Sequence, residues 1–73
     1  MQQVVRRVMA YIHEHYAEPI TREEMAAHAH VGERHLDRCF RRETGMTPLT
    51  YLTRYRIRQA RAWLEQGDRS IAE

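Results

Sequence analysis

The stretch from His30 to Pro48 carries the side chains whose chemistry is easiest to interpret. It places arginines next to a histidine and an aspartate, at Arg34, His35, Asp37, Arg38, Arg41 and Arg42. A guanidinium group donates paired hydrogen bonds that match phosphate oxygens or the O6 and N7 atoms of guanine. A carboxylate can accept a hydrogen bond from the amino group of cytosine. These residue types together suit the recognition of nucleic acid.

The arginines can act together only if one helix presents them on one face. With Leu36 facing inward and about 100° of rotation per residue, Arg34, Arg38 and Arg41 fall on the opposite side of a helix. Asp37 and Arg42 flank them. Exposed arginines also occur on ordinary solvated helix faces, where Arg34 could pair with Asp37. The stripe alone leaves both interpretations open, so the elements that hold it must decide.

Apolar spacing and boundary residues predict four helices and no strands. An apolar face recurs at Val5, Val8, Met9, Ile12 and Tyr16, which predicts a first helix over residues 3–16, ended by Pro19. Thr21 and Glu24 have the spacing of a capping box and open a second helix over 21–29. Gly32 as N-cap and Gly45 as C-terminal glycine bound a third helix, 33–44. Pro48 begins a fourth, 48–66.

The second and third helices have the spacing of a helix-turn-helix. Small and apolar residues fall where two short helices crossing through a tight turn require them, at Met25, Ala26, Ala29, Val31, Leu36, Cys39 and Phe40. His30 stands where such turns commonly have glycine, and a positive φ is expected there, which histidine tolerates better than most residues. An arginine face on the second helix of this motif predicts insertion into the DNA major groove.

Size and composition agree with a small helical domain. The chain has 73 residues and a formal net charge of +2, and all of its basic residues are arginine. The placement of the arginines therefore carries more information than the net charge. The single cysteine, Cys39, cannot form an internal disulfide, and no stretch reaches the length of a transmembrane span. We expect a cytoplasmic protein.

The fourth predicted helix has an apolar side at Leu52, Tyr55, Ala60 and Trp63, with Arg54, Arg58 and Arg61 opposite. A basic amphipathic helix can lie on an anionic membrane or bind a partner. We prefer a core-facing helix with a solvated back, because so small a core needs this apolar side. Arg56 falls on the apolar side, so we expect its stem to lie on the core and its guanidinium to pair with a carboxylate.

Metal binding and catalysis have little support. Histidines at positions 13, 15, 28, 30 and 35 accompany Cys39, but no spacing brings three ligands together, so we expect no metal and no cofactor. The chain has no glycine-rich phosphate loop and no nucleophile with a neighbouring base, and we expect a non-enzyme. A different class remains open: a small helical protein-protein interaction module with a solvated arginine face.

Three stretches make the chain resemble the AraC/XylS family of bacterial transcription regulators. They are "ITREEMA" at 20–26, "RHLDRCFRRETGMTP" at 34–48 and "YLTRYRIRQARAWL" at 51–64. The resemblance implies an all-α fold: a homeodomain-like three-helix unit with a helix-turn-helix, followed by a long linker helix. It implies that residues 1–66 are the first helix-turn-helix subdomain with its linker, and that 67–73 begin a truncated second one. Ser70 and Glu73 have capping-box spacing, as Thr21 and Glu24 do.

The resemblance also implies roles for single residues and for partners. The recognition helix would be 33–44, with base contacts from Arg34, Asp37 and Arg38 and phosphate contacts from His35, Arg41 and Arg42. The partner would be double-stranded DNA, with no membrane involved. Dimerisation or effector binding would use regions outside this chain. Gly32 departs from the family pattern, which often has serine or threonine before the recognition helix.

Overall fold

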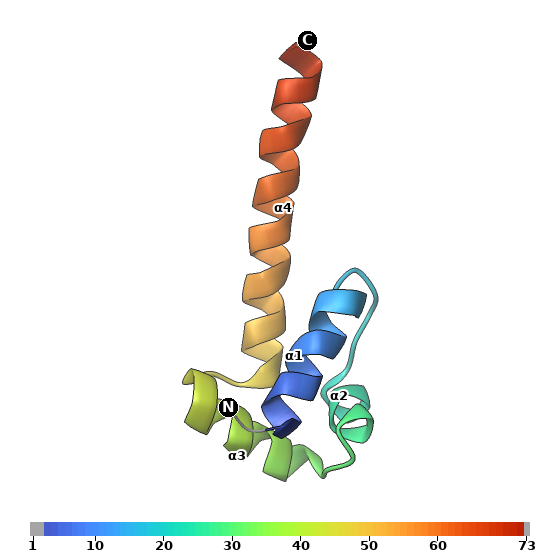
Figure 1. Ribbon diagram of the computed structural model, residues 1–73, viewed down its shortest axis with the longest axis vertical. Helices are drawn as coiled ribbons and strands as arrows, with labels where there is room; N and C mark the ends of the chain where they lie inside the picture. The colour runs from blue at the N-terminus through green and yellow to red at the C-terminus, as the bar shows by residue number, and fades with distance from the viewer. Residues whose placement is uncertain (1–2, 73) are drawn as a thin grey trace.

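The computed structural model describes the backbone of residues 3–72 and the side chains of residues 3–66. Its four helices are α1 (Gln3–His15), α2 (Arg22–His28), α3 (Glu33–Thr44) and α4 (Pro48–Ala72). The described part of the chain contains no strand, so the predicted all-α class is confirmed. The first three helices gather around the first half of α4, whose second half extends away from them (Figure 1). The molecule therefore measures 48 × 21 × 16 Å.

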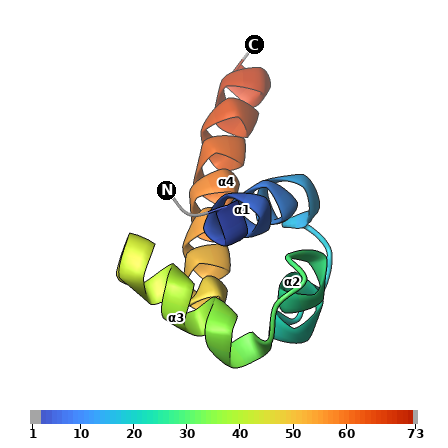
Figure 2. The same ribbon diagram turned by 60° about the horizontal axis from the view of Figure 1, so that its bottom comes forward.

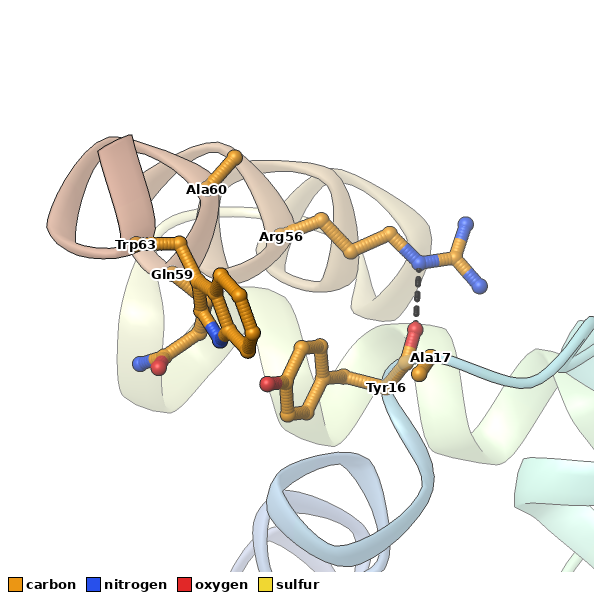
Figure 3. Close-up of a pocket in the computed structure, with 6 residues that line it drawn as sticks. All are labelled: Tyr16, Ala17, Arg56, Gln59, Ala60 and Trp63. Atoms are coloured by element: carbon orange, nitrogen blue, oxygen red, sulfur yellow. Dashed lines mark hydrogen bonds between the residues drawn. The ribbon is translucent and has the colours of Figure 1, made fainter. Parts of the chain in front are cut away.

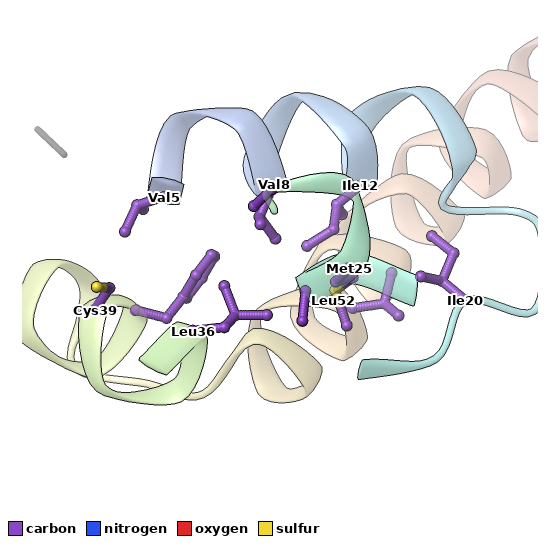
Figure 4. Close-up of a cluster of buried hydrophobic side chains, with 11 residues drawn as sticks. Val5, Val8, Ile12, Ile20, Met25, Leu36, Cys39 and Leu52 are labelled. Carbon is purple, nitrogen blue, oxygen red and sulfur yellow. The ribbon is translucent and has the colours of Figure 1, made fainter. Parts of the chain in front are cut away.

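The core lies where α1, α2 and α3 meet the start of α4 (Figure 4). The residues buried in it are Val5, Val8, Ile12, Ile20, Met25, Ala26, Ala29, Leu36, Cys39, Phe40 and Leu52. The predicted inward positions of α1 through α3 are thus confirmed, with Met9 and Tyr16 half-buried at the margin. Each helix contributes only the narrow face that its apolar period defines, so its other face remains free for solvent or ligand.

The capping box that the sequence predicts opens α2. The Thr21 hydroxyl oxygen accepts from the Glu24 backbone N–H at 3.0 Å, and the Glu24 carboxylate accepts from the Thr21 backbone N–H at 3.0 Å. These two bonds satisfy two of the donors that a helix start leaves without partners. A helix of 7 residues is too short to persist by itself. The box therefore helps to fix where α2 begins.

The turn between α2 and α3 is a Schellman motif with a histidine at its left-handed position. His30 has φ 60°, as predicted. The Val31 N–H donates to the Ala26 carbonyl at 3.0 Å, and the His30 N–H donates to the Ala27 carbonyl at 3.1 Å. These are the 6→1 and 5→2 bonds that close a helix through one left-handed residue. The same geometry directs Val31 back onto the core.

The α3–α4 connection also follows its sequence signals. Gly45 has φ 78°, and its N–H donates to the Arg41 carbonyl at 2.9 Å, which ends α3. Thr47 then caps α4, because its hydroxyl oxygen accepts from the Thr50 N–H at 3.2 Å. Pro48 occupies the first helical position, where a missing N–H costs nothing. Two residues thus separate the cap of one helix from the start of the next helix.

Arg56 ties α4 to the end of α1, but not in the way the sequence suggests. Its Nε donates to the Tyr16 carbonyl at 2.7 Å, and a terminal nitrogen donates to the Glu18 carbonyl at 2.7 Å. The predicted carboxylate partner is therefore wrong, because these backbone oxygens past the end of α1 take the guanidinium instead. A cation in this place also complements the negative end of the α1 dipole.

Only the first half of α4 faces the core. Leu52 is 2% exposed, whereas Trp63 is 72% exposed and Leu64 is 69% exposed. The prediction that the whole apolar side, Ala60 and Trp63 included, closes the core is wrong. The physical reason is length: the 13 residues of α1 span about 20 Å, whereas the 25 of α4 span about 37 Å. The shorter helices cannot cover the far half.

The predicted end of the fourth helix near Gln66 is also wrong, since α4 continues to Ala72. A glycine inside a helix costs only about 1 kcal/mol, and no proline follows Gly67 to force an end. The capping box predicted at Ser70 and Glu73 lies outside the residues whose side chains are described. The assignment of 67–73 to a second subdomain remains a prediction.

We predict that Thr21→Ala lowers the free energy of unfolding by about 1 kcal/mol, because it removes the acceptor for the Glu24 N–H. Thermal unfolding followed by far-UV circular dichroism measures the change. Thr53→Ala is the matched control, because Thr53 is exposed inside α4 and its hydroxyl donates to the Leu49 carbonyl of the same helix. The control should stay within about 0.5 kcal/mol of the parent. Equal losses for both variants would contradict the capping role.

At the turn, we predict opposite effects for two substitutions of the exposed His30. A left-handed conformation costs a non-glycine residue roughly 1–2 kcal/mol, part of which glycine returns through its freer unfolded chain. His30→Gly should therefore raise the unfolding free energy by up to about 1 kcal/mol. His30→Val should lower it by about 1 kcal/mol, because β-branched residues rarely adopt positive φ. Denaturant titration orders the three proteins, and a valine variant as stable as the glycine variant would refute the argument.

Candidate nucleic-acid interface

The helix α3 lies at the periphery of the unit, next to α2 and away from the projecting end of α4 (Figures 1 and 2). Leu36 and Phe40 on its inner face are fully buried, and Cys39 is nearly so. The Phe40 ring packs edge to face on Tyr51 of α4, with ring centroids 5.4 Å apart. The side chains of Tyr51 and Leu52 on α4 thus support α3 from behind. The apolar inner face therefore anchors α3 to the core.

The outer face of α3 carries the residues that the sequence singles out. Arg34, Arg38, Arg41 and Arg42 are exposed, and so is His35. Arg34, Arg38 and Arg41 recur at intervals of four and three residues, which places them in one row along the helix. Arg34, Arg38 and Arg41, which are among the residues predicted to contact bases or phosphates, therefore share a single accessible face. Each guanidinium carries five N–H donors.

Asp37 is placed differently from the arginines. It is half-buried on the side of α3 that faces α2, and its Oδ2 accepts from a terminal nitrogen of Arg22 at 3.0 Å. Its Oδ1 is buried and has no hydrogen-bond partner among the described residues. Asp37 therefore pairs across the turn with Arg22, and not with Arg34 as it could on an ordinary solvated helix face. The structure does not bring Asp37 into the outward arginine row.

Sequence reasoning missed Arg22, the first residue of α2. Its Nε donates to Glu33 at 2.9 Å while its terminal nitrogen donates to Asp37, so one guanidinium joins two carboxylates of α3. The hydrogen bond to Glu33, followed by the charge of Asp37, raises the pKa of the Arg22 guanidinium above its ordinary value. The sequence signal was the Glu33–Asp37 spacing of four residues, which puts both carboxylates on one face. No local sequence pattern showed that Arg22 of α2 reaches the face of α3 that carries Glu33 and Asp37.

Other groups of polar side chains make a weaker case for a site. His35 Nε2 lies 3.5 Å from the Cys39 sulfur, but within the described residues no three histidine, cysteine or acidic side chains gather to hold a metal. In the part of the chain with a described structure, no helix combines the length and apolarity needed to cross a membrane.

Two hollows lie along α4, and none of the three arginines in the row lines either of them. One of about 320 Å³ lies between the end of α1 and α4, where the rings of Tyr16 and Trp63 approach each other beside Arg56 (Figure 3). A smaller one of about 130 Å³ lies between Met46 and Arg58. Neither collects a nucleophile with a base, so the arginine face of α3 is the candidate site.

Comparison with known proteins agrees with this geometry. A family model described as a helix-turn-helix domain matches residues 25–73. The HTH-type transcriptional activator RhaS of Klebsiella pneumoniae is 35% identical over 69 residues, which is 94% of this chain and 25% of the relative. RhaS of Salmonella schwarzengrund is 36% identical over the same share of each chain. No solved structure matches the chain significantly.

A relative from another bacterium matches over a similar length. The uncharacterized HTH-type transcriptional regulator YbfI of Bacillus subtilis is 39% identical over 67 residues, 92% of this chain and 24% of the relative. The chain thus spans about a quarter of the length of the curated relatives it matches. The family match at 25–73 includes the end of α2 and the whole of α3 and α4. On its fold and on these matches, the chain belongs to the AraC/XylS-type family of helix-turn-helix domains.

Proposed function

We propose that this chain is the DNA-binding part of a bacterial transcription regulator and that it inserts α3 into the major groove of double-stranded DNA. The observation that carries the proposal is the exposed row Arg34, Arg38 and Arg41 on the second helix of a helix-turn-helix. A major groove admits an α-helix, and the N-terminal part of a recognition helix contacts base edges. The other face of α3 is buried, so this row is the face available to DNA.

Within this proposal, the position of each residue along α3 suggests its role. Arg34 and Arg38 lie in the first half of the helix and would donate to guanine edges. Arg41, Arg42 and His35 would contact phosphates, which position the protein without reading sequence. The sequence predicts Asp37 as a third base contact, but its two oxygens are bound or covered in the free chain. The proposal therefore rests on the two arginines.

The names of the relatives support regulation of transcription as the role. RhaS is a transcriptional activator and YbfI a transcriptional regulator, and neither description names an enzyme. The alternative, a protein-protein interaction module with a solvated arginine face, does not explain why these arginines stand on a helix-turn-helix. We therefore expect non-catalytic action in the cytoplasm, where bacterial DNA lies. Dimerisation and effector binding would belong to other parts of a longer polypeptide.

The far half of α4 supports a second element of the proposal. Trp63 and Leu64 are mostly exposed although both are large and apolar. Contiguous exposed apolar side chains usually mark a surface that another element covers. We propose that α4 is the linker helix and that a second helix-turn-helix unit covers this end in the longer polypeptide. The relatives are about four times as long as this chain, which leaves room for such a unit.

We predict that Arg38→Ala reduces affinity for a selected DNA sequence by about 5- to 150-fold, the range expected for one lost bidentate contact to a base. A duplex pool with a randomised central segment provides the sequence, and fluorescence anisotropy measures binding. The base preference at one position should relax. Arg41→Ala should instead weaken binding to all duplexes alike and reduce the slope of affinity against salt by about one.

Arg61→Ala is the control. Arg61 is exposed on the far half of α4, and its substitution removes the same charge. This variant should keep the parental base preference. An Arg38→Ala protein that selects the same sequence as the parent would contradict the assignment of Arg38. If the parent binds selected and unrelated duplexes equally, the interaction-module alternative gains support instead.

For α4, we predict that the fluorescence of Trp63, the single tryptophan of this chain, reports the second unit. In the 73-residue chain its emission should lie at long wavelength and be quenched readily by iodide, because Trp63 is 72% exposed. In the longer polypeptide the emission should shift to shorter wavelength and resist iodide, with any other tryptophans replaced by phenylalanine. Identical quenching in both proteins would show that nothing covers this end of α4.

A further inference from the structure

A polar connection joins the two helices of the helix-turn-helix in addition to their apolar contacts. Arg22 of α2 donates at 2.9 Å to Glu33 and at 3.0 Å to Asp37, which lie one turn apart at the start of α3. We call these three residues the α2–α3 tie. Their side chains are 45%, 41% and 28% exposed, so the tie lies at the surface and not in the core.

The tie acts on the part of α3 that matters most for reading DNA. Arg34 lies next to Glu33, and Arg38 lies next to Asp37, so each proposed base contact neighbours one member of the tie. A small rotation of α3 about its buried face would move both arginines relative to the base edges. Leu36 and Phe40 fix the depth of the helix, but apolar contacts are not directional. A forked guanidinium that holds two carboxylates is directional and resists such a rotation.

Asp37 is better placed for this job than for contacting a base. One oxygen is taken by Arg22, and the other is buried from solvent. A cytosine amino group could reach the carboxylate only after the hydrogen bond from Arg22 breaks and the Asp37 side chain rotates. Release would also leave Glu33 and Asp37 uncompensated beside DNA phosphates, which repel them. The ion pair with Arg22 cancels part of that repulsion.

Building on the proposed function, we propose that Arg22 is a positioning residue for sequence-specific DNA binding. It acts through Glu33 and Asp37 to hold the recognition helix at the angle that aligns Arg34 and Arg38 with the bases. Asp37 serves this tie and does not read a base. The tie should strengthen specific binding and have little effect on non-specific binding, because contacts to phosphates alone tolerate small rotations of the helix.

The test compares affinities for the selected duplex and for an unrelated duplex, whose ratio cancels a general change in charge. Arg22→Gln should lower this ratio by about two- to fivefold, the range that a surface ion pair supports. Asp37→Asn should lower it similarly, and the double variant should be no worse than either single variant. Arg22→Lys, which keeps the charge, should restore part of the ratio. Far-UV circular dichroism checks that each variant keeps the parental helix content.

Arg61→Gln is the matched control, because it removes one positive charge far from α3 and should leave the ratio unchanged. Selection from the randomised pool is the second readout, and all variants of the tie should prefer the parental base at every position. An altered base preference in Asp37→Asn but not in Arg22→Gln would overturn the inference and identify Asp37 as a base reader. An unchanged ratio in Arg22→Gln would overturn it as well. A parental ratio of one would instead refute the proposed function, and this inference with it.

Discussion

The burial of one narrow face of α3 is the constraint on which the rest of the structure depends. Leu36 and Phe40 are fully enclosed by α1, α2 and the start of α4. Since a helix presents its apolar residues on a stripe of about a third of its circumference, burying that stripe sends the intervening residues outward. The arginines are exposed for this reason and not because of any contact of their own. Loss of the Phe40 packing would remove core contacts and also the support that keeps the arginine row facing outward.

The tight turn before α3 has a similar dual consequence. A left-handed His30 lets Ala26 and Ala27 accept the closing hydrogen bonds, and it sends Val31 back to the core. The chain therefore needs few residues to pass from one helix to the next. The short connection also brings Arg22, at the start of α2, within reach of Glu33 and Asp37. The polar tie across the motif is a product of the backbone turn.

The two halves of α4 have different physical situations. The first half closes the core through Leu52 and is held by Arg56, which donates to backbone carbonyls past the end of α1. The second half has no neighbouring helix in the described structure, so Trp63 stays in solvent (Figure 1). A rigid helix that is stabilised at one end can carry another unit at its other end. This geometry is consistent with a linker, which the sequence also predicts.

The sequence by itself determined most of the features that depend on neighbours three or four residues apart, with the end of α4 as the exception. The capping box at Thr21, the left-handed positions at His30 and Gly45, and the start of α4 at Pro48 are all local. The buried face of each helix also follows from its period. Only the tertiary structure decided the partners of Arg22 and Arg56 and the exposure of Trp63. These depend on crossing angles and relative helix lengths, which are set when the apolar faces pack together.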